Sequence, residues 1–279
     1  MKLLVVALYP EARPWIVRLG LKKPSSANGL EVYLGQGHAL LVTGVGKVPA
    51  AVRVARALEL SELSGVRCVI NIGICGCADA SIALGTVFLA NKIEEAGTGR
   101  AFFPDMLVRH PFLESALVTV ERPVLDGPNP LAGPVLYDME AAGIFQAASC
   151  FVTADRQHYI KVVSDHLDGG MLSKERIEEL VEQAADAVLD FVNALPDVSL
   201  DRRCVLLQED EAALDKLCAA LRLTRTQSVQ VRDWAIAYRL AGKQLLATRL
   251  SAVAESQPEG QTKADRATAL ETLQYELAT

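Results

Sequence analysis

Short apolar runs alternate with longer amphipathic segments along the first two thirds of the chain. Each run is too short for a buried helix, and Gly, Pro or polar residues stand at its ends. This pattern is typical of strands that are buried on both faces. We therefore predict strands at residues 3–7, 39–43, 68–73, 86–90, 116–120 and 159–164.

Three further segments have hydrophobic positions that repeat every 3.6 residues, the period of an amphipathic helix. They are residues 48–60, 139–150 and 173–195, and Ser173 stands where a helix N-cap is expected. Alternation of strands and helices predicts an α/β sandwich around a mostly parallel or mixed sheet.

The pattern changes after residue 195. Two amphipathic helices are indicated at 209–222 and 226–241, a polar linker at 255–265 and a short helix at 264–277. We therefore predict a main domain at 1–195 and a helical extension at 196–279 with a partly flexible end.

The composition is that of a soluble globular protein, with 51% hydrophobic and 22% charged residues among 279. No run of 18 apolar residues without charges occurs, and the N-terminal apolar run is too short for a signal peptide. We therefore expect a cytoplasmic protein with no membrane association. The net charge of −6 argues against a nucleic-acid partner, although residues 201–250 hold nine Lys or Arg against six Asp or Glu.

The six cysteines include no C-x-x-C pair, and most lie in apolar runs, so we interpret them as reduced and buried thiols. Cys75 and Cys77 differ, because we place them in a Gly-containing loop. No histidine or second cysteine pair nearby completes a metal site. We expect neither a metal nor a cofactor.

Polar residues follow several predicted strands, at the edge where α/β sheets bind ligands. Glu11 follows the first strand, and Ser164 and Asp165 follow the last. Gly73 and Gly76 are placed where a backbone can approach a ligand or make a tight turn. Each residue alone has a structural explanation: a helix-start acid, a turn, or an Asx-turn.

Five short motifs give these residues a common context. ALYPEA, VTGVGKVPAA, VINIGICG, YDMEAAGI and VVSDHLD follow one another along residues 1–192. In this order they resemble the nucleoside phosphorylase/nucleosidase superfamily, and most of all its methylthioadenosine/S-adenosylhomocysteine nucleosidase branch. The resemblance implies a three-layer α/β sandwich with a central mixed sheet and a substrate with a cleavable N-glycosidic bond. It also implies a homo-oligomer.

The resemblance assigns catalytic roles to two acids. Glu11 matches the glutamate that activates water in the hydrolytic branch. Asp165 matches the acid that interacts with the purine N7 and lets the base leave as a neutral species. Ser164 would help to orient Asp165.

The same resemblance predicts the substrate-binding residues. Glu140 matches the glutamate that holds the sugar hydroxyls, and Met139 would lie beneath the ribose. Cys75 and Gly76 match the loop that runs beneath sugar and base, and Val124 stands where backbone contacts the base. Asp138 gains no such role, and we interpret it either as a helix-start acid or as an acid that supports the residues in contact with the substrate.

Two departures favour water over phosphate as the acceptor. Family members that use phosphate read R-x-G-[ST]-x-G at the third strand, where this chain has Asn71 at the Arg position and Ile74 at the Ser/Thr position. Their Gly-Asp-Pro-x-x-Arg type loop is also missing, which leaves Arg13 as the candidate cation. The sequence therefore predicts hydrolysis, with phosphorolysis as the alternative.

Two departures from the nucleosidases leave a further alternative open. The nucleosidases usually carry Ser at the position of Ile74, and residues 100–136 form a shorter interval than the family has before its Met-Glu motif. That interval normally builds much of the base pocket. A nucleoside-binding or regulatory relative without turnover is therefore the alternative from another functional class.

Overall fold

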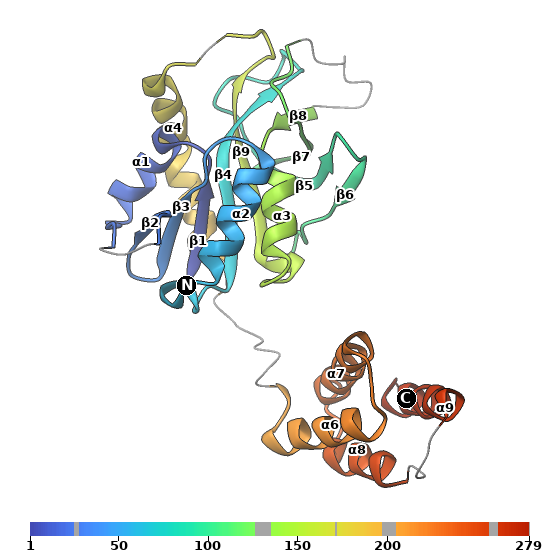
Figure 1. Ribbon diagram of the computed structural model, residues 1–279. Coiled ribbons are helices and arrows are strands. Elements are labelled where there is room, and N and C mark those ends of the chain that lie inside the picture. The colour runs from blue at the N-terminus through green and yellow to red at the C-terminus, as the bar shows by residue number, and fades with distance from the viewer. Residues whose placement is uncertain (25–27, 126–134, 171, 197–204, 257–261, 279) are drawn as a thin grey trace. The chain divides into compact units, whose positions relative to one another are not determined.

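The computed structural model describes residues 1–24, 28–125, 135–170, 172–196, 205–256 and 262–278. The chain divides into two compact units, unit 1 at Met1–Asp197 and unit 2 at Val198–Thr279. Unit 1 contains a nine-stranded mixed sheet, and unit 2 is helical (Figure 1).

The sheet of unit 1 combines parallel and antiparallel pairs. Its strands are β1 (Lys2–Val6), β2 (Glu31–Leu34), β3 (His38–Val42), β4 (Cys68–Cys77), β5 (Val87–Glu95), β6 (Arg100–Phe102), β7 (Leu113–Thr119), β8 (Val135–Asp138) and β9 (Gln157–Asp165). The path runs β2-β3-β1-β4-β8-β7-β5-β6, and β9 pairs with both β4 and β5. The pairings of β4, β8, β7, β5 and β9 therefore close into a ring.

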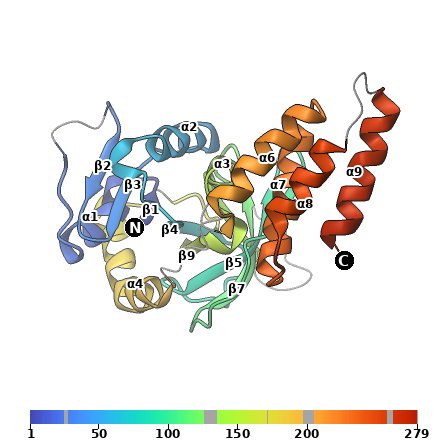
Figure 2. The same ribbon diagram turned by 90° about the horizontal axis from the view of Figure 1, so that it is seen from below.

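Helices cover both faces of this sheet. Their bounds are α1 (Tyr9–Arg18), α2 (Lys47–Leu58), α3 (Ala141–Ala148) and α4 (Lys174–Ala194). Figures 1 and 2 show α1 and α4 on one face and α2 and α3 on the other. Alternate residues of β1 enter the two hydrophobic cores: Leu3 and Val5 pack towards α2 and α3, and Leu4 and Val6 towards α1 and α4. The predicted three-layer sandwich is confirmed.

Most of the predicted elements of unit 1 are present. Each predicted strand and helix overlaps an observed one, and the Ser173 hydroxyl accepts a hydrogen bond from the backbone N–H of Arg176 at 3.2 Å as a true N-cap. The sequence pattern missed β2, β6, β8 and α1. The last was hidden by Pro10 and Pro14, because proline usually ends or kinks a helix.

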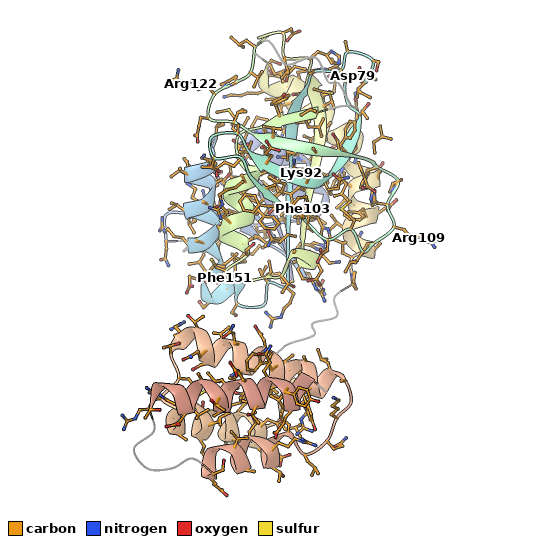
Figure 3. All side chains as sticks on the ribbon, turned by 90° about the vertical axis from the view of Figure 1, so that its right-hand side faces the viewer. Asp79, Lys92, Phe103, Arg109, Arg122 and Phe151 are labelled. Carbon is orange, nitrogen blue, oxygen red and sulfur yellow. The ribbon has the colours of Figure 1, made fainter. Side chains whose placement is uncertain are left out.

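Unit 2 has its own core between four helices, α6 (Gln208–Ala220), α7 (Arg225–Leu240), α8 (Leu246–Glu255) and α9 (Lys263–Ala278). Figure 3 shows side chains filling the interior of each unit. The buried Asp210 carboxylate joins α6 to α7, because it accepts hydrogen bonds from Nε and Nη2 of Arg239 at 2.9 and 2.8 Å.

The predicted linker in this region needs correction. A linker at 255–265 is wrong at its ends, since α8 continues to Glu255 and α9 begins at Lys263; its middle, 257–261, lies outside the described residues. The apolar positions Leu246 and Leu250 are buried in the core of unit 2, which stabilises α8 despite its weak sequence signal.

Candidate active site

A pocket of about 250 Å³ lies at the carboxyl ends of β1, β4, β8 and β9, the edge at which α/β sheets bind ligands. Its lining includes all eight residues that the sequence singles out: Glu11, Cys75, Gly76, Val124, Met139, Glu140, Ser164 and Asp165. These residues come from five separate segments of the chain. The structure thus brings the predicted residues to one place.

Glu11 lies in the first turn of α1 and is 2% exposed. Its Oε2 accepts hydrogen bonds from the backbone N–H groups of Ala7 and Leu8, both at 2.8 Å, and its Oε1 accepts one from Ile74 at 2.9 Å. Burial raises the pKa of this carboxyl above its ordinary value, against the opposing effect of the three N–H donors. The donors fix the carboxyl in one orientation. Oε2 already accepts two of these bonds, whereas Oε1 accepts one and retains a lone pair for a ligand.

Glu140 is the residue that precedes α3, and it is 7% exposed. Its Oε1 accepts a hydrogen bond from the backbone N–H of Gly46 at 2.8 Å. Burial, followed by the nearby charge of Asp138, raises the pKa of Glu140 to about 7. This carboxyl therefore changes its charge near neutral pH, while Oε2 has no hydrogen bond from the described residues in this structure.

Asp138, the last residue of β8, binds the first N–H of α3 and forms an ion pair with a buried lysine. Its Oδ2 accepts from the backbone N–H of Ala141 at 2.8 Å, and its Oδ1 accepts from the hydroxyl of Thr119 at 2.7 Å. The interpretation of Asp138 as a helix-start acid is confirmed. The same Oδ2 lies 2.9 Å from Nζ of Lys161, and both side chains are almost completely buried.

Lys161, in β9, is the charged residue that the sequence analysis missed. Burial disfavours its charge, but Asp138 and Glu140 outweigh that effect, so the pKa of Lys161 is raised. Glu11 contributes in the same direction. Lys161 thus interacts electrostatically with three carboxyls, those of Asp138, Glu140 and Glu11. The sequence did contain a signal for this residue, a lysine inside an apolar strand. A lysine buried there requires an acidic partner, which indicates a nearby carboxylate.

Ser164 and Asp165 lie at the end of β9, as predicted. The register of β4 with β9 shifts here: Cys75 pairs with Val163 and Gly76 with Asp165, which leaves Ser164 as the extra residue of a bulge. The Ser164 hydroxyl lies 2.7 Å from Oδ2 of Asp165 and 3.1 Å from the carbonyl oxygen of Cys75. Oδ1 of Asp165 also accepts from the N–H of Leu167 at 3.0 Å, the Asx-turn that was the structural alternative.

The placement of Cys75 and Cys77 in a loop is wrong. Both belong to β4 and are buried, because the strand continues to Cys77 through its glycines. Gly76 is needed for close packing rather than for a turn, since a Cβ there would overlap the side chain of Leu167 and stand 3.1 Å from Oδ1 of Asp165. Burial raises the pKa of the Cys75 thiol well above its ordinary value, so this cysteine stays a neutral wall of the pocket.

The remaining walls are largely apolar. They include Val45, Ile74, Val120, Pro123, Val124, Met139 and Leu167. Among the lining residues that the structure describes there is no lysine or arginine. Arg13, the candidate cation of the sequence analysis, does not line the pocket; its side chain is 57% exposed and pairs with Glu178 of α4 at 2.5 Å.

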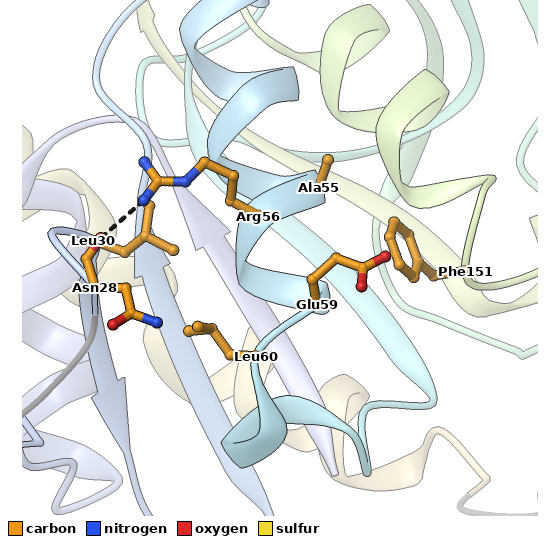
Figure 4. A pocket seen from close by; sticks show the side chains of 7 residues that line it. All are labelled: Asn28, Leu30, Ala55, Arg56, Glu59, Leu60 and Phe151. Atoms are coloured by element: carbon orange, nitrogen blue, oxygen red, sulfur yellow. Dashed lines mark hydrogen bonds between the residues drawn. The ribbon is translucent and has the colours of Figure 1, made fainter.

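A second hollow, of about 450 Å³, is open and contains none of the predicted site residues. It is lined by Asn28, Leu30, Ala55, Arg56, Glu59, Leu60 and Phe151. Figure 4 shows the Arg56 guanidinium turned towards the backbone of Asn28, whose carbonyl oxygen it contacts at 2.8 Å. Phe151 and Phe103, labelled in Figure 3, are 40% and 60% exposed.

Within the described parts of the chain, no three His, Cys, Asp or Glu side chains are grouped as a metal site would require. Nor does any described helix combine the length and apolar character needed to cross a membrane.

Comparisons with known proteins identify the fold. Residues 6–124 match the model of the phosphorylase superfamily. Unit 1 has the phosphorylase-superfamily fold. No curated protein sequence matches the chain significantly.

Three solved structures illustrate this phosphorylase-superfamily fold, and each covers 70% of the present chain. One is the 5′-methylthioadenosine/S-adenosylhomocysteine nucleosidase of Streptococcus pneumoniae, solved with a transition-state inhibitor. It is 21% identical to the present chain with a TM-score of 0.57, and the match covers 100% of the nucleosidase chain. The corresponding nucleosidase of Colwellia psychrerythraea, solved with adenine, is 19% identical, with a TM-score of 0.56 and 95% coverage. A futalosine hydrolase mutant of Helicobacter pylori is 12% identical, with a TM-score of 0.55 and 99% coverage.

Proposed function

We propose that unit 1 hydrolyses the N-glycosidic bond of a purine-nucleoside-like substrate. The observation that carries this proposal is the convergence of Glu11, Glu140 and Asp165 on one pocket. Solved structures of the same fold are nucleosidases that act on methylthioadenosine and S-adenosylhomocysteine, and one of them holds adenine. The mechanism below assigns one task to each acid.

Glu140 binds the ribose in this mechanism. Gly46 occupies its Oε1, which leaves Oε2 directed to the hydroxyl groups of the sugar. An ionised carboxylate accepts hydrogen bonds from hydroxyls, and these strengthen as positive charge develops on the ring in the transition state. Met139 supplies an apolar surface beneath the sugar.

Asp165 protonates the leaving base. As the bond between C1′ and the purine nitrogen breaks, its electron pair passes into the purine ring, and the carboxyl of Asp165 delivers a proton to N7. The base then leaves as a neutral molecule. A positioned general acid contributes about 10²–10⁴-fold to the rate. The Ser164 hydroxyl, at 2.7 Å from Oδ2, orients this carboxyl.

Glu11 activates the water. The water oxygen forms the new bond to C1′, and its proton passes to the Glu11 carboxylate. The pKa of Glu11 is raised by burial, which makes it a stronger base than an exposed glutamate. Cys75, Gly76 and Val124 complete the walls around sugar and base.

Water fits this pocket better than phosphate does. A phosphate dianion needs guanidinium, hydroxyl or backbone N–H donors, whereas carboxyls line the described pocket and no arginine does. The backbone N–H groups of Ala7, Leu8 and Ile74 are already bonded to Glu11. Asn71, at the position of the phosphate-binding arginine, is buried and donates to the carbonyl oxygen of Val5 at 3.0 Å.

The direct test is incubation with adenosine, inosine, methylthioadenosine and S-adenosylhomocysteine, each with and without phosphate. Release of free base without phosphate is the expected result. If base is released only when phosphate is present, the reaction is phosphorolysis and the proposal of hydrolysis is wrong. Tight nucleoside binding without any base release would instead indicate a binding protein.

A further inference from the structure

The backbone at the start of α2 contacts the ribose-binding carboxylate of the proposed mechanism. Gly46 is the residue that precedes α2, and its N–H donates to Oε1 of Glu140 at 2.8 Å. Gly46 has a φ of +105°, a conformation that side chains other than glycine rarely adopt. The turn at Gly46 is therefore specific for glycine and directs its N–H towards the carboxylate of Glu140.

The next residue, Lys47, anchors this turn. Its Nζ forms ion pairs with Glu95, at the end of β5, and with Glu121, which follows β7. Glu95 is 7% exposed and is held further by the hydroxyl of Thr98, at 2.7 Å from its Oε2. The start of α2 is thus tied to two strands of the ring.

A close backbone contact fixes the same turn from the other side. Gly143 lies in the first turn of α3, and a Cβ at this position would overlap the carbonyl oxygen of Lys47 and stand 2.8 Å from its carbonyl carbon. Backbone atoms cannot move aside as the end of a flexible side chain can. The absence of a side chain at residue 143 therefore sets the distance between α2 and the segment that carries Glu140.

We propose that the Gly46–Lys47 turn is a positioning device for Glu140, with Lys47 and Gly143 as its positioning residues. This inference rests on the proposed function for the identity of the ligand, a ribose. The N–H of Gly46 binds Oε1 of Glu140 and holds the carboxylate in one orientation. Oε2 is then already placed to accept hydrogen bonds from the sugar hydroxyls when the ligand binds. Neither Lys47 nor Gly143 lines the pocket.

Gly143→Ala tests the proposal, because its added methyl group must displace the start of α2. We expect kcat/KM for the cleaved nucleoside to fall by about 10-fold to 100-fold, the effect of losing a hydrogen bond to a charged group. Gly65→Ala is the matched control, since a Cβ at residue 65 meets no atom within 4 Å. The control is expected to behave as the wild-type protein does.

A second measurement does not depend on turnover. Carbon-13 NMR of protein labelled at glutamate Cδ follows the titration of Glu140, whose signal is assigned by its loss in Glu140→Gln. The pKa of about 7 includes the lowering effect of the Gly46 N–H. Loss of that donor is expected to raise the pKa of Glu140 by about half a unit or more. An unchanged titration and unchanged kcat/KM in folded Gly143→Ala would overturn the proposal.

Lys47 provides the variant that adds no steric clash. Lys47→Met removes both ion pairs and is expected to shift the Glu140 titration in the same direction, whereas Lys47→Arg is expected to restore it. If Glu140 titrates in Lys47→Met as it does in the wild-type protein, Lys47 does not position Glu140. If the wild-type protein releases no base from any nucleoside, the proposed function fails, while the NMR titrations still decide whether the turn positions Glu140.

Discussion

Glu11, Glu140 and Asp165 are all carboxylic acids, yet the hydrogen-bond donors around them differ. Glu11 accepts three backbone N–H bonds, Glu140 accepts one, and Asp165 accepts one from a hydroxyl and one from a backbone N–H. Burial raises the pKa of the first two. In the proposed mechanism these different surroundings suit the three acids to different tasks, which is the usual way in which a site separates acid from base.

Asp165→Asn tests the leaving-group acid. The amide keeps the shape and the hydrogen bond to Ser164 but does not deliver a proton to the purine. We expect kcat to fall at least about 100-fold while nucleoside affinity is preserved, as measured by base release and by calorimetry. Asp168→Asn, the same change at an exposed residue outside the pocket, serves as the control. Turnover equal to wild type in Asp165→Asn would remove Asp165 from the mechanism.

The pH dependence of catalysis tests Glu140. Its pKa is raised to about 7, so the free protein holds Glu140 protonated at lower pH. Because the ionised form binds the ribose hydroxyls, kcat/KM is expected to rise as the pH increases through about 7. The free energy of unfolding changes in the opposite direction: a raised carboxyl pKa means that stability falls as the pH rises from about 4.5 to 7.

Glu140→Gln provides the comparison for this profile. The variant lacks the titrating carboxyl, so we expect the rise of kcat/KM near pH 7 to disappear, together with the fall in the free energy of unfolding between about pH 4.5 and 7. A rise that persists unchanged in Glu140→Gln would assign the titration to another group, such as Glu11.

Among the elements, β4 contributes most to the shape of the site. It lies beside β1, β8 and β9, and its glycines let neighbouring side chains approach its backbone. A Cβ at Gly73 would stand 2.9 Å from Oε1 of Glu11 and 3.7 Å from Nζ of Lys161. The strand therefore supports the charged groups beneath the pocket only because residue 73 has no side chain.

Gly73→Ala is expected to displace the Glu11 carboxyl and to break its hydrogen bond with the N–H of Ile74. We predict a fall in kcat of about 10-fold or more with little change in nucleoside affinity, because Glu11 acts on water and not on the sugar. Kinetics and a thermal melt are compared with those of Gly65→Ala. A kcat equal to that of the control would show that the Glu11 carboxyl tolerates the added methyl group.

Across the whole molecule, each unit has its own hydrophobic core. Two clusters lie within unit 1, and a third, which includes Leu217, Val231 and Leu273, lies within unit 2. All eight pocket residues of the sequence analysis belong to unit 1. The homo-oligomer and the cytoplasmic location expected from the sequence stay predictions.

Separate expression of residues 1–197 and 198–279 tests this division. Because each core is complete within its unit, we expect both fragments to give cooperative thermal transitions by circular dichroism. Residues 1–197 are also expected to release base at the rate of the full chain. A fragment 1–197 that is folded but inactive would show that unit 2 contributes to the activity.

Periodicity alone predicted much of the architecture. The buried strands of the sheet centre were evident as short continuous apolar runs, and the helices α2, α3 and α4 were evident because their apolar positions repeat every 3.6 residues. Elements that depend on tertiary contacts were not evident from the sequence. α1 contains two prolines, β8 has four residues, and α8 depends on a core built by distant helices.

The order of motifs along the sequence also selected eight positions that the fold brings to one pocket. Only the tertiary structure decided their electrostatics. The Lys161–Asp138 pair, the Gly46 N–H on Glu140 and the bulge at Ser164 join segments that are far apart in the chain. Burial and hydrogen bonding set the charge of each acid, and both arise from through-space contacts that no local pattern of residues records.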